Sequence, residues 1–104
     1  MKTKQAIMVE FEAVQTQANR LEQCAEALRQ VQSQMENIVQ SLNSGWQGDS
    51  ASCFVAKCTA LDEKIGKSAA NIQQISKVIQ KTAKDYYSAE LCALEIAQKR
   101  TYKA

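Results

Sequence analysis

The chain has 104 residues and a formal net charge of +2 at pH 7, with no proline, no histidine and only three glycines. This length supports one domain, and the shortage of turn-forming residues argues against a sheet-rich fold. Without histidine, the chain can have neither a histidine base nor a histidine metal ligand, and the small net charge gives no indication of nucleic-acid binding. The sequence therefore predicts an all-α protein that is not an enzyme and needs no cofactor or metal.

Apolar residues recur every seven positions through the first half of the chain and predict a helix over about residues 4–43. Gln32 interrupts a companion apolar column. It either sets the register between helices or points outward while Val31 fills the core, and the second interpretation is the simpler one. The residues expected to form the core and dimer face of this helix are Ile7, Phe11, Val14, Leu21, Leu28, Met35 and Leu42.

The segment at about residues 44–48 is the one cluster of turn-forming residues in the sequence, and it predicts a reversal of the chain. Gly45 is expected to adopt the left-handed conformation that closes a helix. Asp49 or Ser50 is expected to cap the second helix by accepting a hydrogen bond from a backbone amide.

The seven-residue period resumes after the turn and predicts a second helix over about residues 49–98, packed at a shallow angle against its neighbours. Gly66 lies inside this helix and marks either a close approach between helices or a neutral substitution. The basic tail at 99–104 lacks a helix opposite it and is expected to fray. The residues expected to form the core and dimer face are Phe54, Leu61, Ile65, Ile72, Ile75 and Ile79.

Two helices of this length bury one side each against one another and leave a long apolar groove in water, which monomers avoid. We therefore expect residues 1–104 to form a single domain, a hairpin of two long antiparallel helices that dimerises into a four-helix bundle. A homodimer is expected, and a heterodimer with a related chain stays open.

Nothing near the N-terminus looks like a signal-peptide core, and no stretch approaches the roughly 18–20 apolar residues of a membrane span. The chain is therefore expected to be made in the cytoplasm and, if exported, to leave without a cleaved signal peptide. Neither helix shows the strongly basic and strongly apolar faces of an interfacial helix, so stable membrane insertion is not expected.

Trp46 is the only tryptophan, and it lies in the turn two residues before Gly48. Late in the second helix, Tyr86 and Glu90 are four residues apart and share a helix face. With its length and two-helix layout, the chain resembles the WXG family of small type VII (ESX-type) secretion substrates, the early-secreted-antigen-like helical hairpins. Members carry a central Trp-x-Gly and a late Tyr-x-x-x-Asp/Glu that belongs to the export signal. The simpler interpretation makes Trp46 a cover for the core, Tyr86 a core position and Glu90 a solvated charge.

The resemblance implies a dimeric substrate or adaptor of a type VII machine, with the motor ATPase as a partner and a larger co-exported toxin as a further candidate. In an antiparallel dimer, Trp46 and Gly48 of one subunit neighbour Tyr86 and Glu90 of its mate. We expect the motor to recognise this composite surface. The alternatives are an intracellular coiled-coil scaffold and a chaperone-like targeting partner of a larger secreted toxin.

Four cysteines occur without a Cys-x-x-C spacing, and no pair is expected to meet within the hairpin. They are therefore expected to be structural thiols that behave as small apolar residues, with an intersubunit bridge through Cys92 as the alternative. The set is Cys24, Cys53, Cys58 and Cys92.

Overall fold

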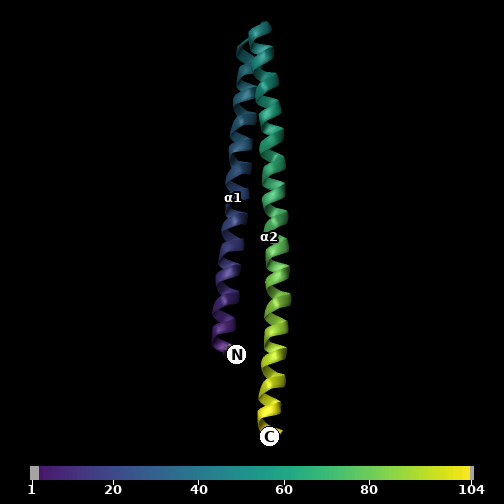
Figure 1. Ribbon diagram of the computed structural model, residues 1–104. Helices are drawn as coiled ribbons and strands as arrows, with labels where there is room; N and C mark the ends of the chain where they lie inside the picture. The colour runs from purple at the N-terminus through teal and green to yellow at the C-terminus, as the bar shows by residue number, and fades with distance from the viewer. Residues whose placement is uncertain (1–2, 104) are drawn as a thin grey trace. The chain divides into compact units, whose positions relative to one another are not determined.

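The computed structural model describes residues 3–103, with side chains described as far as Arg100, and consists of two helices joined by a three-residue turn (Figure 1). Helix α1 spans Lys4–Gly45 (42 residues), and helix α2 spans Asp49–Lys103 (55 residues). No strand occurs between residues 3 and 103. The prediction of an all-α chain with two long antiparallel helices is confirmed, and its assembly into a four-helix bundle stays a prediction.

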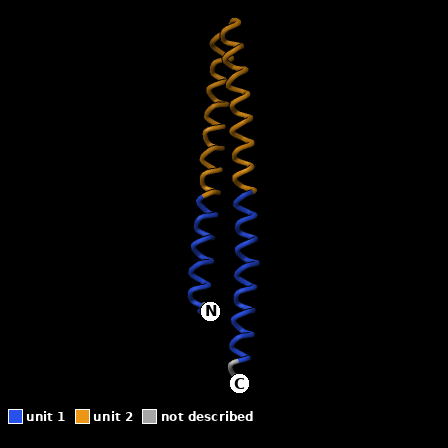
Figure 2. Tube along the Cα trace, in the orientation of Figure 1, with its two compact units in different colours: residues 1–20, 75–104 blue, residues 21–74 orange. Residues whose placement is uncertain are grey.

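The chain divides into two compact units, each of which combines a segment of α1 with a segment of α2 (Figure 2). Unit 1 joins residues 1–20 to residues 75–104, and unit 2 is formed by residues 21–74. Within each unit the two segments run antiparallel, and we call the line along which they touch the seam.

The seam of unit 1 is built from small residues. Ala18 and Ser76 are fully buried, and the Ser76 hydroxyl donates a hydrogen bond of 2.8 Å to the carbonyl oxygen of Ala18. The Gln80 side-chain amide donates to the Ser76 hydroxyl oxygen at 3.2 Å. Toward the end of the unit, the rings of Phe11 and Tyr87 lie 4.6 Å apart. Small side chains let the helices approach closely, and the buried hydroxyl is satisfied across the seam.

In unit 2, Ala25 and Ala69 are fully buried at the seam. Gln32 is half-buried, and its side-chain amide donates to the Asp62 carbonyl oxygen at 3.4 Å. A Cβ atom added to Gly66 would lie 2.8 Å from Gln32 Nε2, so this glycine marks a close approach between helices.

The simpler interpretation of Gln32 is wrong. Its side chain enters the seam of unit 2, whereas Val31, the residue expected to fill the core, is 44% exposed. The physical reason is that Gly66 on the opposite helix leaves room for the long amide side chain, and the Asp62 carbonyl offers it an acceptor.

Both helices extend beyond their expected ends. Helix α1 continues two residues past position 43, and α2 reaches Lys103 rather than about residue 98. Residues 99–103 are thus helical where fraying was expected, and residue 104 lies outside the described residues. The sequence offers no glycine or proline after Gly66 to stop α2, and the charges of Lys99 and Arg100 suit the negative end of the helix dipole.

Candidate docking surface and export motifs

The turn is organised around Gly48, which has a φ of +116°. The Trp46 amide donates to the Leu42 carbonyl oxygen at 2.8 Å and ends α1, and the Ser52 amide donates to the Gly48 carbonyl oxygen at 3.0 Å and begins α2. The positive-φ glycine is therefore Gly48 and not Gly45. Gly48 also takes the capping position expected for Asp49 or Ser50, because it is the residue whose carbonyl accepts the first bond of α2.

We predict that Gly48→Ala lowers the free energy of unfolding by about 1–2 kcal/mol, because a side chain at this positive φ is strained although the surrounding space is open. Gly45→Ala is the matched control: its site is equally open, its φ is not positive, and it lies in the last turn of α1. Urea denaturation should show a loss for the first variant and none for the second. An equal effect of both variants would contradict this account of the turn.

Trp46 and Phe54 form an exposed aromatic pair beside the turn. Their ring centroids lie 6.0 Å apart at an interplanar angle of 56°, and the residues are 43% and 46% exposed, respectively. We call them the tip pair. Because almost half of each residue faces solvent, the tip pair is available to a partner molecule.

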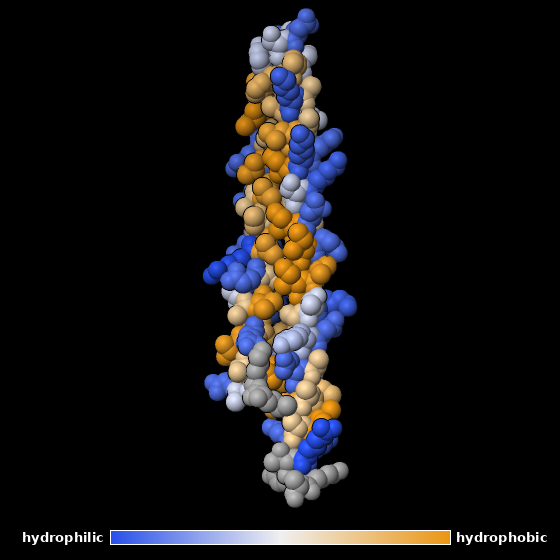
Figure 3. All heavy atoms as spheres, in the orientation of Figure 1, coloured by the Kyte–Doolittle hydropathy of each residue, from blue (hydrophilic) through white to orange (hydrophobic). Residues whose placement is uncertain are grey.

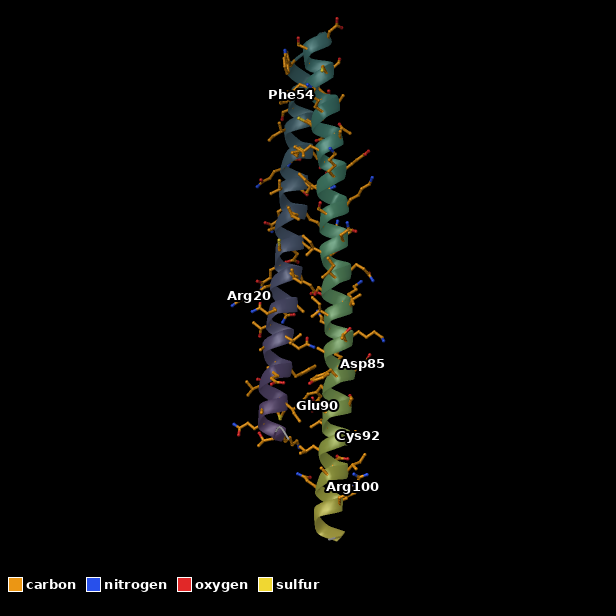
Figure 4. The ribbon with its side chains drawn as sticks, viewed as in Figure 1. Arg20, Phe54, Asp85, Glu90, Cys92 and Arg100 are labelled. Atoms are coloured by element: carbon orange, nitrogen blue, oxygen red, sulfur yellow. The ribbon has the colours of Figure 1, made fainter. Side chains whose placement is uncertain are left out.

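The two residues of the late motif, Tyr86 and Glu90, differ in their exposure to solvent. Tyr86 is 53% exposed, whereas Glu90 is half-buried and occupies the same seven-residue column of α2 as the buried Ser76. Figure 4 shows Glu90 between Asp85 and Cys92 on the second half of α2. Tyr86 is thus the more accessible of the two motif residues.

The residues expected to form the core divide into two groups. Ile7 is buried, and half-buried side chains are found at Phe11, Leu21, Leu28, Met35, Leu42, Ile65, Ile72 and Ile79. Val14, Phe54, Leu61 and Ile75 are exposed. Phe54, Leu61 and Ile75 belong to one seven-residue column of α2. This column lies outside the seam, because α2 meets α1 through the neighbouring column that contains Ala69 and Ser76.

The two sides of the seam in unit 2 differ in chemistry. On one side, the Arg29 guanidinium donates to the Gln73 side-chain oxygen at 2.9 Å. On the other side, the heptad geometry of an antiparallel pair groups four exposed apolar residues. They are Val31, Ile38, Phe54 and Leu61.

Unit 1 has the same arrangement. Gln15 and Gln80 occupy the polar side of its seam, and apolar side chains remain exposed on the opposite side. Apolar side chains gather along the face presented in Figure 3. We call the exposed apolar side of each unit its apolar face. In unit 1 it is formed by Val14, Ile75, Val78 and Tyr86.

A cavity of about 360 Å³ opens in unit 1 next to Tyr86, and we call it the Tyr86 pocket. Its lining is apolar except for Glu10, Thr82 and the tyrosine hydroxyls. The lining residues are Ile7, Glu10, Phe11, Val14, Val78, Ile79, Thr82, Ala83, Tyr86 and Tyr87.

The remaining chemistry of the described residues is sparse. All four cysteines are free thiols; Cys58 is half-buried and the other three are exposed. Between residues 3 and 103, no group of three or more cysteine, aspartate or glutamate side chains could hold a metal ion. Neither helix, over its described length, is apolar enough to cross a membrane.

Comparison with protein families gives a match over most of the chain. The family model WXG100, described as proteins of 100 residues with WXG, matches residues 6–91. The matched region contains the turn with Trp46 and Gly48 as well as Tyr86 and Glu90. No curated protein and no solved structure matches the chain.

Proposed function

Because the chain belongs to the WXG100 family of small type VII secretion substrates, we propose that it is a non-enzymatic substrate or adaptor exported as a homodimer. Members of this family typically form dimers and work with type VII systems. In this proposal the chain is made in the cytoplasm and leaves without a cleaved signal peptide. Its partner is the secretion motor ATPase, with a larger co-exported toxin as a further candidate.

The observation that supports a dimer is the apolar face of each unit. Val31, Ile38 and Leu61 are each more than two-fifths exposed in unit 2, although large side chains of this kind are usually buried. A contiguous apolar surface bounded by polar side chains is typical of protein–protein interfaces. A second copy of the chain supplies an equal apolar face, and the two faces together form the core of a four-helix bundle.

The export signal in this proposal combines the turn of one copy with the late motif of the other. Trp46 and Tyr86 support it because each exposes about half of an aromatic side chain that can enter a pocket of the motor. Glu90 adds a carboxylate one helical turn after Tyr86. A signal shared between two copies would make export depend on dimerisation.

Secretion from the native host tests this proposal. Trp46→Ala, Tyr86→Ala and Glu90→Ala are each expected to abolish secretion, with the protein still present inside the cell. The matched controls are Tyr87→Phe, which keeps the tilted ring contact with Phe11, and Glu95→Ala, which removes an exposed carboxylate outside the motif. Both control variants should be secreted normally.

The solution mass of each variant separates a lost signal from a lost dimer. Only a variant that still dimerises tests the proposed export signal. Unchanged secretion of all three motif variants would refute that signal. If the unmodified chain stays inside the cell while its secretion machine exports other substrates, an intracellular scaffold replaces the proposed function.

A further inference from the structure

We propose that a cavity on the polar side of the seam in unit 2 binds the guanidinium group of an arginine side chain from a partner protein. The cavity has a volume of about 260 Å³, and we call it the acidic pocket. This inference goes beyond the proposed function, because it depends neither on export nor on dimerisation. The residues that line the acidic pocket are Met35, Glu36, Val39, Gln40, Thr59 and Asp62.

The two carboxylates of the acidic pocket have no cation to pair with. Among the described residues, the Oδ1 atom of Asp62 is buried and has no hydrogen-bond partner. In the same part of the chain, no salt bridge joins Glu36 or Asp62 to a lysine or arginine, and the lining itself contains neither residue type. A buried carboxylate without a partner is destabilising, so the pocket favours a positively charged ligand.

The fold places the Asp62 carboxylate at the seam without neutralising it. Asp62 occupies the same seven-residue column of α2 as the buried Ala69 and Ser76. The nearby Gln32 amide donates to the backbone carbonyl oxygen of Asp62 at 3.4 Å, and this bond leaves the carboxylate unsatisfied. A ligand that donates hydrogen bonds and carries a positive charge would supply what the seam does not.

The other lining groups suit a guanidinium on an aliphatic stem. The Thr59 hydroxyl donates to the Val55 carbonyl oxygen at 3.0 Å, so its own oxygen is left to accept a hydrogen bond. Gln40 offers a further carbonyl oxygen. A guanidinium has five N–H donors in one plane and no acceptor, which matches a lining rich in acceptors. Met35 and Val39 provide apolar surface for the methylene groups of an arginine.

The size and position of the acidic pocket favour a single side chain of a partner protein. Pockets for small-molecule ligands usually measure roughly 300–1,000 Å³, and this one is smaller. Glu36 lies in the same column of α1 as Arg29, and Thr59 in the same column of α2 as Gln73, the pair that marks the polar side of the seam. The pocket therefore lies on the side opposite the apolar face of unit 2 and stays open in the proposed dimer.

A titration followed by nuclear magnetic resonance tests the ligand. Adding N-acetyl-arginine methylamide to the purified, ¹⁵N-labelled chain should shift the backbone amide signals of Thr59 and Asp62 in a saturable way. The citrulline analogue has nearly the same shape without the charge and should leave these signals unchanged. The lysine analogue should bind more weakly, because an ammonium cannot present a planar fork to two carboxylates. Equal binding of the lysine analogue, or the same shifts with Ca²⁺ alone, would identify a general attraction for cations and overturn the proposal.

Replacing Asp62 tests the site. Asp62→Ala should weaken binding of the arginine probe at least about tenfold, because a hydrogen-bonded charge is lost. Without the probe, this variant should melt no lower than the unmodified chain, because alanine is already accommodated in this column at position 69. Glu63→Ala is the matched control: it removes an exposed carboxylate from the neighbouring position of α2, which does not line the pocket, and it should bind the probe normally.

A second variant addresses the opposite wall of the pocket. Glu36→Gln should also weaken binding of the arginine probe, whereas Glu26→Gln, at an exposed position of α1 outside the pocket, should not. Unchanged affinity in Asp62→Ala and in Glu36→Gln would overturn the acidic pocket and leave the proposed export intact. A chain that is never secreted but binds the probe with the expected selectivity would refute the proposed function and support the pocket.

Discussion

Replacing Leu61 with arginine is expected to convert the proposed dimer into folded monomers. Leu61 is 49% exposed in the described chain, so its outer half is available for burial against a second copy. Burying a leucine side chain contributes about 1.5–3 kcal/mol, so this outer half contributes roughly 1 kcal/mol from each copy. An arginine would in addition place an unpaired charge in the interface. Together these effects should raise the dimer dissociation constant at least a hundredfold, which corresponds to about 3 kcal/mol.

Ala60→Arg is the control for this prediction, because Ala60 is the exposed neighbour of Leu61 and lies outside the apolar face of unit 2. Sedimentation equilibrium should give monomers for Leu61→Arg and dimers for Ala60→Arg, and circular dichroism should show both variants to be helical. A Leu61→Arg chain that dimerises as tightly as the unmodified protein would show that the apolar face is not the interface.

Ala69→Leu is expected to destabilise the hairpin itself. Ala69 is fully buried at the seam of unit 2, and a larger side chain there must force the two helices apart. Overpacking of this kind costs about 1–3 kcal/mol, and we expect the upper part of this range because two rigid helices limit the adjustment. For a domain of this size the melting temperature should fall by roughly 10 °C or more.

The neighbouring position supplies the control. Ala70 is exposed on the same helix, so Ala70→Leu changes the composition in the same way without entering the seam. Thermal denaturation should show a large decrease for the first variant and almost none for the second. If Ala69→Leu melted at the unmodified temperature, close approach through small residues would not be what holds the two helices together.

The sequence predicts the helices well because two independent signals agree. The seven-residue repeat of apolar side chains is incompatible with a strand, and the glycines around Trp46 leave one place for the chain to reverse. Helix ends were harder to predict. Gly45 and Gly48 look equivalent in sequence, and only the hydrogen bonds of the turn show that Gly48 takes the positive φ.

The sequence could not predict which seven-residue column of α2 packs against α1. Phe54, Leu61 and Ile75 look like core by size, and Ala69 and Ser76 do not. In the structure, Ala69 and Ser76 are buried and the three large residues are exposed. The reason is that helices approach most closely where side chains are smallest, which leaves the large residues beside the seam.

Gln32 illustrates the same limit for a polar residue. A glutamine in an apolar column is satisfied inside only if the opposite helix provides both space and an acceptor. In unit 2 these come from Gly66 and the Asp62 carbonyl, which follow Gln32 by 34 and 30 positions in the sequence. The apolar periodicity of one helix contains no information about the space and the acceptor that the opposite helix provides.

Sedimentation equilibrium of the purified, unmodified chain tests the central claim, which is that a second copy covers the apolar faces. The account predicts a mass near 23 kDa, twice the 11.6 kDa of one chain. A mass of 11.6 kDa up to the solubility limit would contradict it.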